Sequence, residues 1–391
     1  MAKSRSVPRP RSRVALGVVA TLALLAGCIH VPPPGIGEPI AWGRVPGWND
    51  ERHAQAWPAL LENCKVQAAR DARWETLCAE AQLLTDPDDV SARAFFETRF
   101  TAHALYAERG ATDGLVTGYY EPLLYGSRTP SPRFRYPIYT RPDDLLIVDL
   151  GELYPELKGK RVRGRIDGRR VVPYHSRAQI ENHGGNGKRL AATPIVWVDD
   201  AVELFFLHVQ GSGRVQLPDG EMLFLGYADQ NGHPYHSLGR RLVDAGVMPL
   251  EDVSMQSIRA WLAANPQQLQ AMLHSNPSYV FFEERANDLS GPLGALKVPL
   301  QAERAIAVDP VFVPLGAPVW LDTTLPPGIS TDPPLPYRRL VFAQDTGGAI
   351  KGPVRADVFF GFGARAAELA GQMKQPGRLY VLLPAPRNGA R

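Results

Sequence analysis

The sequence predicts a mainly β protein with a helical N-terminal part, which is an α+β fold. The 391 residues include 36 glycines and 36 prolines, a composition that favours many turns and short strands over a helical bundle. Apolar residues recur at helical spacing within residues 49–110. From Gly114 onward, short apolar runs alternate with turns rich in proline, glycine, aspartate and arginine, as strands require. A chain of this length can bury a large core in two or three domains.

Residues 1–27 have the pattern of a lipoprotein signal peptide. Five basic side chains precede an apolar core, residues 14–26, that is too short to favour a membrane-spanning helix. The core ends in LAGC, which resembles a bacterial lipobox, where a peptidase cleaves before the cysteine (Cys28) and the cysteine is acylated. An ordinary signal peptide, or a membrane anchor that contains a cysteine by chance, is the alternative. Ile29 rather than aspartate follows Cys28, and resemblance to sorted lipoproteins then favours an outer-membrane lipoprotein facing the periplasm of a Gram-negative bacterium.

The formal net charge of +3 belongs to this leader. Without its five of the 43 basic side chains, the rest of the chain is slightly acidic, with 40 acidic side chains. This balance gives no indication of a nucleic-acid partner. Residues 28–48, rich in proline and glycine, are expected to be a lipid anchor followed by a flexible tether.

Three helices are expected after the tether. The first two contain Cys64 and Cys78, and the third runs from Val90 to Tyr106 with Asp88 or Asp89 as its cap. An oxidising compartment favours pairing of the two cysteines. Fourteen residues along one helix would separate them by about 21 Å, so the pair requires a helical hairpin that reverses near residues 69–73. We predict this disulfide; two buried free thiols are the alternative.

The rest of the chain is expected to be mostly β. Pro218-Asp219-Gly220 marks a hairpin between strands at 215–217 and 222–227. Short helices are expected at 176–182, at 254–264 with Ser254 as N-cap, from Pro266 with Asn265 as cap, and at 364–373. The other strands are expected at 136–139, 145–149, 171–174, 279–283, 305–308, 318–321, 340–343, 356–360 and 379–383.

Residues 343–361, AQDTGGAIKGPVRADVFFG, contain the strongest candidate site. Asp345 and Asp357 lie at the ends of two apolar runs, joined by a turn that contains a glycine pair. The residues alone leave two interpretations open. Either the carboxylates form a site, or Asp345 closes an Asx-turn and Asp357 pairs with Arg355.

This stretch resembles the signature of the MltA family, the membrane-bound lytic murein transglycosylases, and of the related 3D domains, named for three aspartates. Asp309 would be the third aspartate. Further blocks follow in the family's order from about Gly118 to Pro384: GYYEP (118–122), HVQGSG (208–213), YADQNGHPYHSLGR (227–240), SMQSIRAWL (254–262), NPSYVFF (276–282) and VPLGAPVW (313–320).

The resemblance implies an architecture that composition does not reveal. Residues 49–123 and 285–391 would form a catalytic domain, with N-terminal helices, around a double-psi β-barrel whose 3D domain spans about 303–384. Residues 124–284 would be a smaller β-barrel domain inserted into it, with a groove between the two for a glycan strand.

The resemblance also implies cleavage of the β-1,4 bond between N-acetylmuramic acid and N-acetylglucosamine in peptidoglycan without hydrolysis. The C6 hydroxyl of the sugar attacks its own C1 and forms a 1,6-anhydro ring, so a single carboxyl can serve as acid and then as base. Asp357 is the candidate for this role, because the apolar residues 358–360 that follow it would raise its pKa. Asp345 and Asp309 are expected to support the site.

Sugar-binding residues are expected around this aspartate. In GYYEP the tyrosines could contact a sugar or belong to the core. Ser212 lacks the GxSxG context of a serine nucleophile and is expected to line the groove. The binding candidates are Tyr119, Tyr120, Glu121, Gln210, Ser212, Gly213, Gly347, Gly348 and Lys351.

No metal or cofactor is expected. The spacing of the histidines fits no standard zinc pattern, so these histidines are expected to be solvated or hydrogen-bonded: His175, His183, His208, His233 and His236. Peptidoglycan glycan strands and the outer membrane are the expected partners, and a cell-wall synthesis or hydrolysis complex stays open. The alternative functions are a non-catalytic glycan-binding scaffold and a muramidase hydrolase, which needs a second carboxylate about 5 to 9 Å away.

Overall fold

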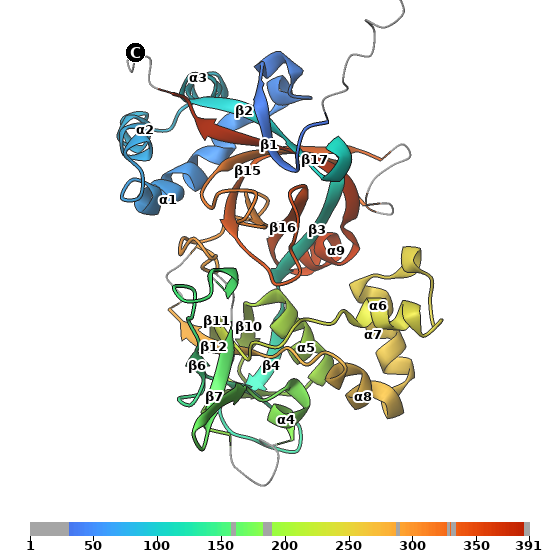
Figure 1. Cartoon of the computed structure of the whole chain (residues 1–391). Coiled ribbons are helices and arrows are strands. Elements are labelled where there is room, and N and C mark those ends of the chain that lie inside the picture. The colour runs from blue at the N-terminus through green and yellow to red at the C-terminus, as the bar shows by residue number, and fades with distance from the viewer. Residues whose placement is uncertain are drawn as a thin grey trace, which may run out of the picture.

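A computed structural model describes residues 31–157, 162–182, 190–286, 290–326, 329 and 334–386. The predicted signal peptide and Cys28 lie outside these residues. Within the described ranges, no helix has the length and apolar character needed to cross a membrane. Figure 1 shows a barrel with helices beside it in one half of the molecule and a second set of strands and helices in the other half.

The segment expected to be a flexible tether is folded onto the body from Gly35 onward, so that expectation is wrong for this part. Strand β1 (Gly35–Ile40) pairs antiparallel with β2 (Phe100–Tyr106). Trp48 is 1% exposed and its indole N–H donates a hydrogen bond to Glu97 (2.9 Å). Burial of this large aromatic ring, 5.3 Å from the ring of Trp320, holds the segment in place.

The N-terminal helices form the expected hairpin. Helices α1 (Trp57–Gln67) and α2 (Ala72–Leu83) are joined by a disulfide between Cys64 and Cys78, whose Cα atoms are 5.4 Å apart. Helix α3 (Asp89–Arg99) is capped by the Asp88 side chain, which accepts a hydrogen bond from the Ser91 N–H.

The third helix does not reach Tyr106 as expected. It ends at Arg99, and the next seven residues form β2, whose backbone pairs with β1 on one side and β17 (Lys374–Pro384) on the other. Because β2 has a paired strand on each side, the backbone N–H and carbonyl groups of this apolar run find hydrogen-bond partners as they would in a helix.

Six strands close into a barrel. In spatial order they are β17, β14 (Pro318–Thr324), β15 (Pro336–Asp345), β13 (Ala305–Val308), β16 (Arg355–Phe362) and β3 (Gly114–Glu121), and β3 pairs with β17 to complete the ring. The β13–β15 and β16–β3 pairs are parallel, and the other pairs are antiparallel. This closed barrel fits the expected double-psi β-barrel fold.

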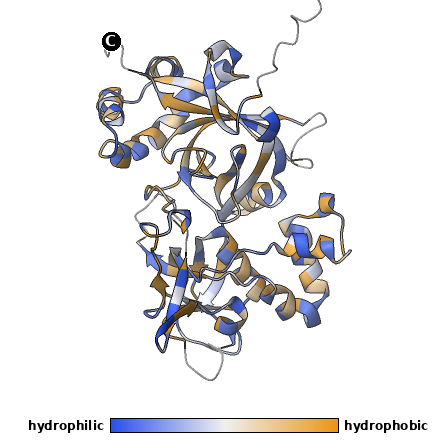
Figure 2. Cartoon of the chain, in the orientation of Figure 1, coloured by the Kyte–Doolittle hydropathy of each residue, from blue (hydrophilic) through white to orange (hydrophobic). Residues whose placement is uncertain are grey.

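All six strands contribute alternate residues to one apolar core, which therefore fills the barrel. Figure 2 shows the hydrophobic residues concentrated on these strands. Helix α9 (Ala364–Gln372) adds Ala366, Leu369 and Ala370 to the same core. Gly118 on β3 is required for this packing, because a Cβ atom there would lie 2.5 Å from Phe360.

The second half of the molecule is built on a six-stranded sheet. Its order is β12 (Val280–Arg285), β11 (Met222–Gln230), β10 (Gly213–Gln216), β4 (Leu123–Ser127), β9 (Pro194–Val198) and β5 (Tyr136–Tyr139), and the edge strands β12 and β5 contact each other. The hairpin at Gly220 is confirmed: β10 and β11 pair, and Gly220 has φ +91°. A second sheet contains β6 (Leu146–Ile147), β7 (Arg163–Asp167) and β8 (Arg170–Pro173).

Five helices accompany these sheets: α4 (Arg177–Glu181), α5 (Ala201–Gln210), α6 (Leu238–Asp244), α7 (Met255–Ala264) and α8 (Leu269–His274). Ser254 caps α7 as expected. The helix expected from Pro266 begins as a 3-10 turn and becomes α-helical only at Leu269. The chain leaves the barrel after β3 and returns after β12, and on this basis we propose an inserted domain at about 124–284.

Candidate active site

Four residues lie at one level across four neighbouring strands of the barrel. Asp345 on β15 and Asp357 on β16 are each paired with Ala307 on β13, and Asp357 is also paired with Thr117 on β3. Paired residues on adjacent strands face the same side of a sheet. Ala307 belongs to a small outer apolar cluster rather than to the barrel core, so both carboxylates face outward from the barrel.

A β-bulge brings Asp345 to this face. Ile306 pairs with Ala343, but the next residue of β13, Ala307, pairs with Asp345, which leaves Gln344 as an extra residue. Ala343 faces the barrel core, and strict alternation would turn Asp345 the same way. The bulge re-aims its side chain, as bulges beside functional sites often do. The buried Gln344 amide donates to Asn63 in α1 (2.7 Å).

The Asp357 carboxyl has one oxygen engaged and one open. Oδ1 accepts a hydrogen bond from the Thr117 hydroxyl (2.5 Å). Among the residues that the structure describes, none donates a hydrogen bond to Oδ2. The carboxyl keeps some solvent-accessible surface, yet the surrounding protein desolvates it, and this burial raises the pKa of Asp357 above its ordinary range. The Thr117 hydrogen bond and Arg355 oppose that rise in pKa, and the Asp345 charge adds to it.

The apolar setting of Asp357 differs from the expected one. Val358 and Phe360 face the barrel core, so of the three following residues only Phe359 shares the face of the carboxyl. Phe359 packs against Tyr119, with ring centroids 5.2 Å apart. The outer apolar cluster beside the aspartates consists of Tyr119, Leu300, Ala305, Ala307, Ile350 and Phe359.

Asp345 is held by several donors. The Tyr119 hydroxyl donates to Oδ2 (2.9 Å), and the N–H groups of Ala295 (3.0 Å) and Thr346 (2.8 Å) donate to Oδ1. Burial raises the pKa of Tyr119 well above its ordinary value, and the Asp345 charge adds to this, so the phenol stays a donor. Asp345 is thus a fixed carboxylate beside the open one, which agrees with a supporting role.

Asp309 holds the loop that joins the two aspartates. It is buried just after β13, and its carboxylate accepts hydrogen bonds from the N–H groups of Gly352 (2.9 Å) and Val311 (3.3 Å). Gly352 has φ +104°, a conformation that favours glycine. Lys351 and Gly348 are exposed on this loop, and the Ile350 N–H donates to the Gly347 carbonyl (3.1 Å) to close its turn. Binding by these three loop residues stays a prediction.

Glu121 has a different environment from the one expected for a sugar ligand. It is 2% exposed, and its two oxygens pair with Arg214 (3.1 Å) and Arg285 (2.8 Å). Glu121 ends the barrel strand β3, whereas Arg214 lies on β10 and Arg285 on β12 of the six-stranded sheet. The carboxylate therefore links the two halves of the chain, and its oxygens are not free for a glycan.

The other binding candidates pack in the same junction. The Tyr120 hydroxyl accepts a hydrogen bond from Arg259 (3.3 Å). The backbone N–H of Tyr120 donates to the Gln210 side-chain oxygen (3.0 Å). Ser212 is buried, and a Cβ atom at Gly213 would lie 2.5 Å from Leu207. These four residues have packing roles, and a direct contact with sugar stays a prediction for them.

The histidines do not gather into a metal site. Within the described part of the chain, no three His, Cys, Asp or Glu residues are placed to hold a metal ion, and His183 lies outside it. His233 is hydrogen-bonded, with Nε2 2.7 Å from the Tyr174 carbonyl oxygen. The expectation is wrong for His208, which is buried against Tyr279, and neither of its ring nitrogens has a hydrogen-bond partner among the described residues. Burial lowers the pKa of His208 well below its ordinary value.

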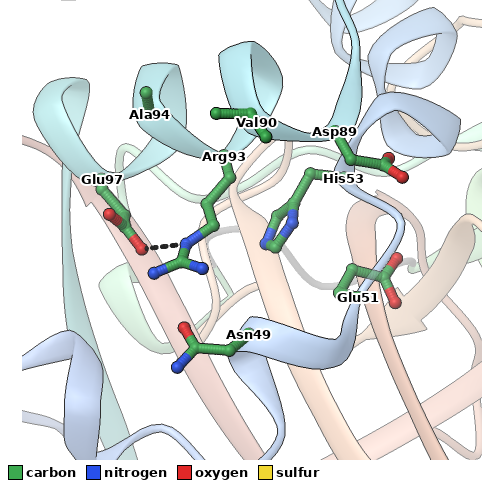
Figure 3. A pocket seen from close by; sticks show the side chains of 8 residues that line it. All are labelled: Asn49, Glu51, His53, Asp89, Val90, Arg93, Ala94 and Glu97. Carbon is green, nitrogen blue, oxygen red and sulfur yellow. Dashed lines mark hydrogen bonds and ion pairs between the residues drawn. The ribbon is translucent and has the colours of Figure 1, made fainter.

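A surface pocket of about 320 Å³ lies away from Asp345 and Asp357, between the N-terminal segment and α3 (Figure 3). His53 lines it, and burial lowers the pKa of this histidine to about 4, so it is neutral at physiological pH. None of the candidate site residues lines this pocket.

Sequence reasoning missed Thr117 as part of the site. It lies 240 positions before Asp357, and only the parallel pairing of β3 with β16 brings the two together. Its position one residue before GYYEP was the available signal.

An open carboxyl of raised pKa beside a fixed carboxylate, on the outer face of a closed β-barrel, is the arrangement that general acid–base chemistry requires. Residues 115–283 match the MltA specific insert domain, and residues 304–383 match the 3D domain. The chain is 33% identical over 275 residues to membrane-bound lytic murein transglycosylase A of Escherichia coli K12. The aligned residues make up 70% of this chain and 66% of that protein.

Solved structures agree with these matches. The MltA structure from Neisseria gonorrhoeae (monoclinic form) is similar with a TM-score of 0.73 and 38% identity, over 92% of this chain and 97% of that one. Escherichia coli MltA with bound chitohexaose is similar with a TM-score of 0.64 and 26% identity, over 91% and 96% of the two chains. The chain belongs to the MltA family.

Proposed function

We propose that this protein is a lytic transglycosylase that cleaves the β-1,4 bond between N-acetylmuramic acid and N-acetylglucosamine in peptidoglycan and leaves 1,6-anhydromuramoyl ends. The environment of Asp357 carries the proposal: a carboxyl of raised pKa with Oδ1 engaged and Oδ2 open. A raised pKa keeps a carboxyl protonated toward neutral pH, as a general acid needs. The chitohexaose complex of the Escherichia coli relative supports a glycan as substrate.

In the first step, Asp357 donates its proton to the glycosidic oxygen as the bond from this oxygen to C1 of the muramic acid breaks. The carboxylate that results then accepts the proton of the C6 hydroxyl, whose oxygen bonds to C1. One proton is given and one is taken, so the enzyme is restored and no water is consumed. The nucleophile is already part of the sugar, which removes the need to position a water molecule.

Asp345 suits a supporting role better than that of a second acid or base. Three donors hold its two oxygens, and its charge raises the pKa of Asp357. Asp345 and Asp357 lie two strands apart, so their Cα atoms are separated by roughly 9 to 10 Å. A hydrolase that activates water would need the two carboxyl groups about 6.5 to 9.5 Å apart, and the reaction products distinguish the two mechanisms.

The variant Asp357→Asn tests the proposal. It keeps the shape of the side chain and its bond to Thr117, but it has no titratable proton. We expect the rate of murein cleavage to fall by about 10² to 10⁴, while binding of insoluble murein persists. Near-normal activity of this variant would contradict the assignment of Asp357. Loss of activity in Asp345→Asn alone would then point to Asp345 as the acid.

The lipobox at Cys28 and the name of the Escherichia coli relative support a membrane association. We propose that the mature protein is anchored in the outer membrane through acylated Cys28 and faces the periplasm.

A further inference from the structure

The guanidinium of Arg355 is fixed between two barrel strands next to the proposed acid. It donates hydrogen bonds to the carbonyl oxygens of Leu115 (3.3 Å) on β3 and Ala356 (2.5 Å) on β16. Its Nη2 donates to the Thr117 hydroxyl oxygen (2.9 Å). Arg355 thus reaches Asp357 through Thr117, and not through the direct pair that the sequence allowed.

These contacts give the hydrogen bonds one direction. A guanidinium has donors and no acceptor, so the Thr117 oxygen must accept from Arg355. The single proton of the Thr117 hydroxyl is then directed at Asp357, where Oδ1 accepts it at 2.5 Å. An oxygen that accepts this bond acts as the carbonyl-like oxygen of the neutral acid, and the acid proton then belongs on Oδ2.

We propose that Thr117 and Arg355 are positioning residues that keep the acid proton of Asp357 on Oδ2, the oxygen open to solvent and to a substrate. Without them the proton could occupy either oxygen, and one of the two faces Thr117 rather than a leaving group. The same hydroxyl stabilises the carboxylate after proton transfer, when Asp357 must act as a base. This inference rests on the proposed function, because it needs Asp357 to be the acid.

The charged and titratable groups around Asp357 determine whether its pKa rises or falls in each variant. Burial raises its pKa, the Thr117 hydrogen bond and Arg355 lower it, and Asp345 raises it. Tyr119 on β3 stays a neutral phenol, and β13 contributes only Ala307 at this level. Removal of the Thr117 hydroxyl or of the Arg355 charge therefore raises the pKa of Asp357. Activity that requires the protonated acid then extends to higher pH.

The experiment measures kcat, KM and the pH profile of murein cleavage for the wild type and four variants. For Thr117→Val and Arg355→Met, we expect kcat to fall about 10- to 100-fold while KM stays within about twofold of the wild-type value. We also expect the alkaline limb of the pH–rate profile, where activity falls as the acid loses its proton, to move to higher pH. Thr117→Ser restores the hydroxyl and should stay within about threefold of the wild type. Arg365→Gln removes the same charge from an exposed site on α9 and should match the wild type.

Each outcome decides the proposal. An unchanged kcat and alkaline limb in both Thr117→Val and Arg355→Met would overturn it, and so would a Thr117→Ser variant as impaired as Thr117→Val. If Thr117→Val fails to fold by circular dichroism, Arg355→Met and Thr117→Ser still decide. An active Asp357→Asn variant would overturn the proposed function itself. An inactive Asp357→Asn with normal Thr117 and Arg355 variants would overturn only the positioning role.

Discussion

Asp345 and Asp357 lie on the same outward face of the barrel, two strands apart, and each is paired with Ala307 of the strand between them. Ala307 carries only a methyl group, and the longer Tyr119 side chain reaches from β3 across this face to Asp345 (2.9 Å). One carboxylate is fixed by three donors, while the other has an open oxygen. The proposed activity depends on this asymmetry between the two carboxylates.

The charge of Asp345 should be visible in the pH dependence of activity. Because this charge raises the pKa of Asp357, Asp345→Asn lowers that pKa and should move the alkaline limb to lower pH. Tyr119→Phe keeps the charge and removes one hydrogen bond, so it should shift the limb less. The pH profile of kcat/KM measures both effects. A shift to higher pH in Asp345→Asn would contradict the electrostatic role.

Glu121 should matter for stability through its ion pairs. Glu121→Gln leaves Arg285 buried with a weakened partner, and loss of one partner of a buried pair costs about 3 to 5 kcal/mol of unfolding free energy. Asp244→Asn breaks the exposed Arg240–Asp244 pair and should cost less than about 1 kcal/mol. Denaturant unfolding compares the two variants. Unchanged stability of Glu121→Gln with a raised KM would favour the sugar-binding role expected from sequence.

The disulfide between Cys64 and Cys78 should stabilise the N-terminal helices. It closes a short loop between α1 and α2, and a loop of this length predicts about 3 kcal/mol of stabilisation. The double variant Cys64→Ala/Cys78→Ala should lose about that much in denaturant unfolding, and reductant should destabilise only the wild type. Two reactive thiols in the denatured, unreduced mature protein would contradict this pairing.

The sequence predicted the elements of the barrel better than their arrangement. Strand 305–308 and the disulfide hairpin follow from local patterns, and the signature around Asp345 and Asp357 indicated the candidate site. The roles of Thr117 and Glu121 depend on pairings across more than 90 residues of chain, which local patterns do not contain. The bulge at Gln344 likewise has no local signal, although it determines the face of Asp345.

The N-terminal segment shows a second limit of composition. Proline and glycine at residues 28–48 indicated a tether, but within this segment β1 pairs at the edge of the sheet and Trp48 is buried. A distant tryptophan, Trp320, provides that burial, and its position follows only from the fold.

Cys28→Ala should release an active, soluble protein. Lipid attachment would be lost, and the folded body begins at Gly35, downstream of the cysteine. Fractionation of cells followed by a salt and carbonate wash measures the release, and murein digestion measures the activity. Membrane association that survives the wash would count against a lipid anchor at Cys28.

Mass spectrometry of the glycan ends released from murein by the wild-type enzyme tests the central claim most directly. The single-carboxyl mechanism predicts 1,6-anhydromuramoyl ends, lighter by one water molecule than hydrolytic ends, and none of these ends with Asp357→Asn. Reducing muramic acid ends, with one oxygen from water labelled with ¹⁸O, would show a hydrolase and contradict the account.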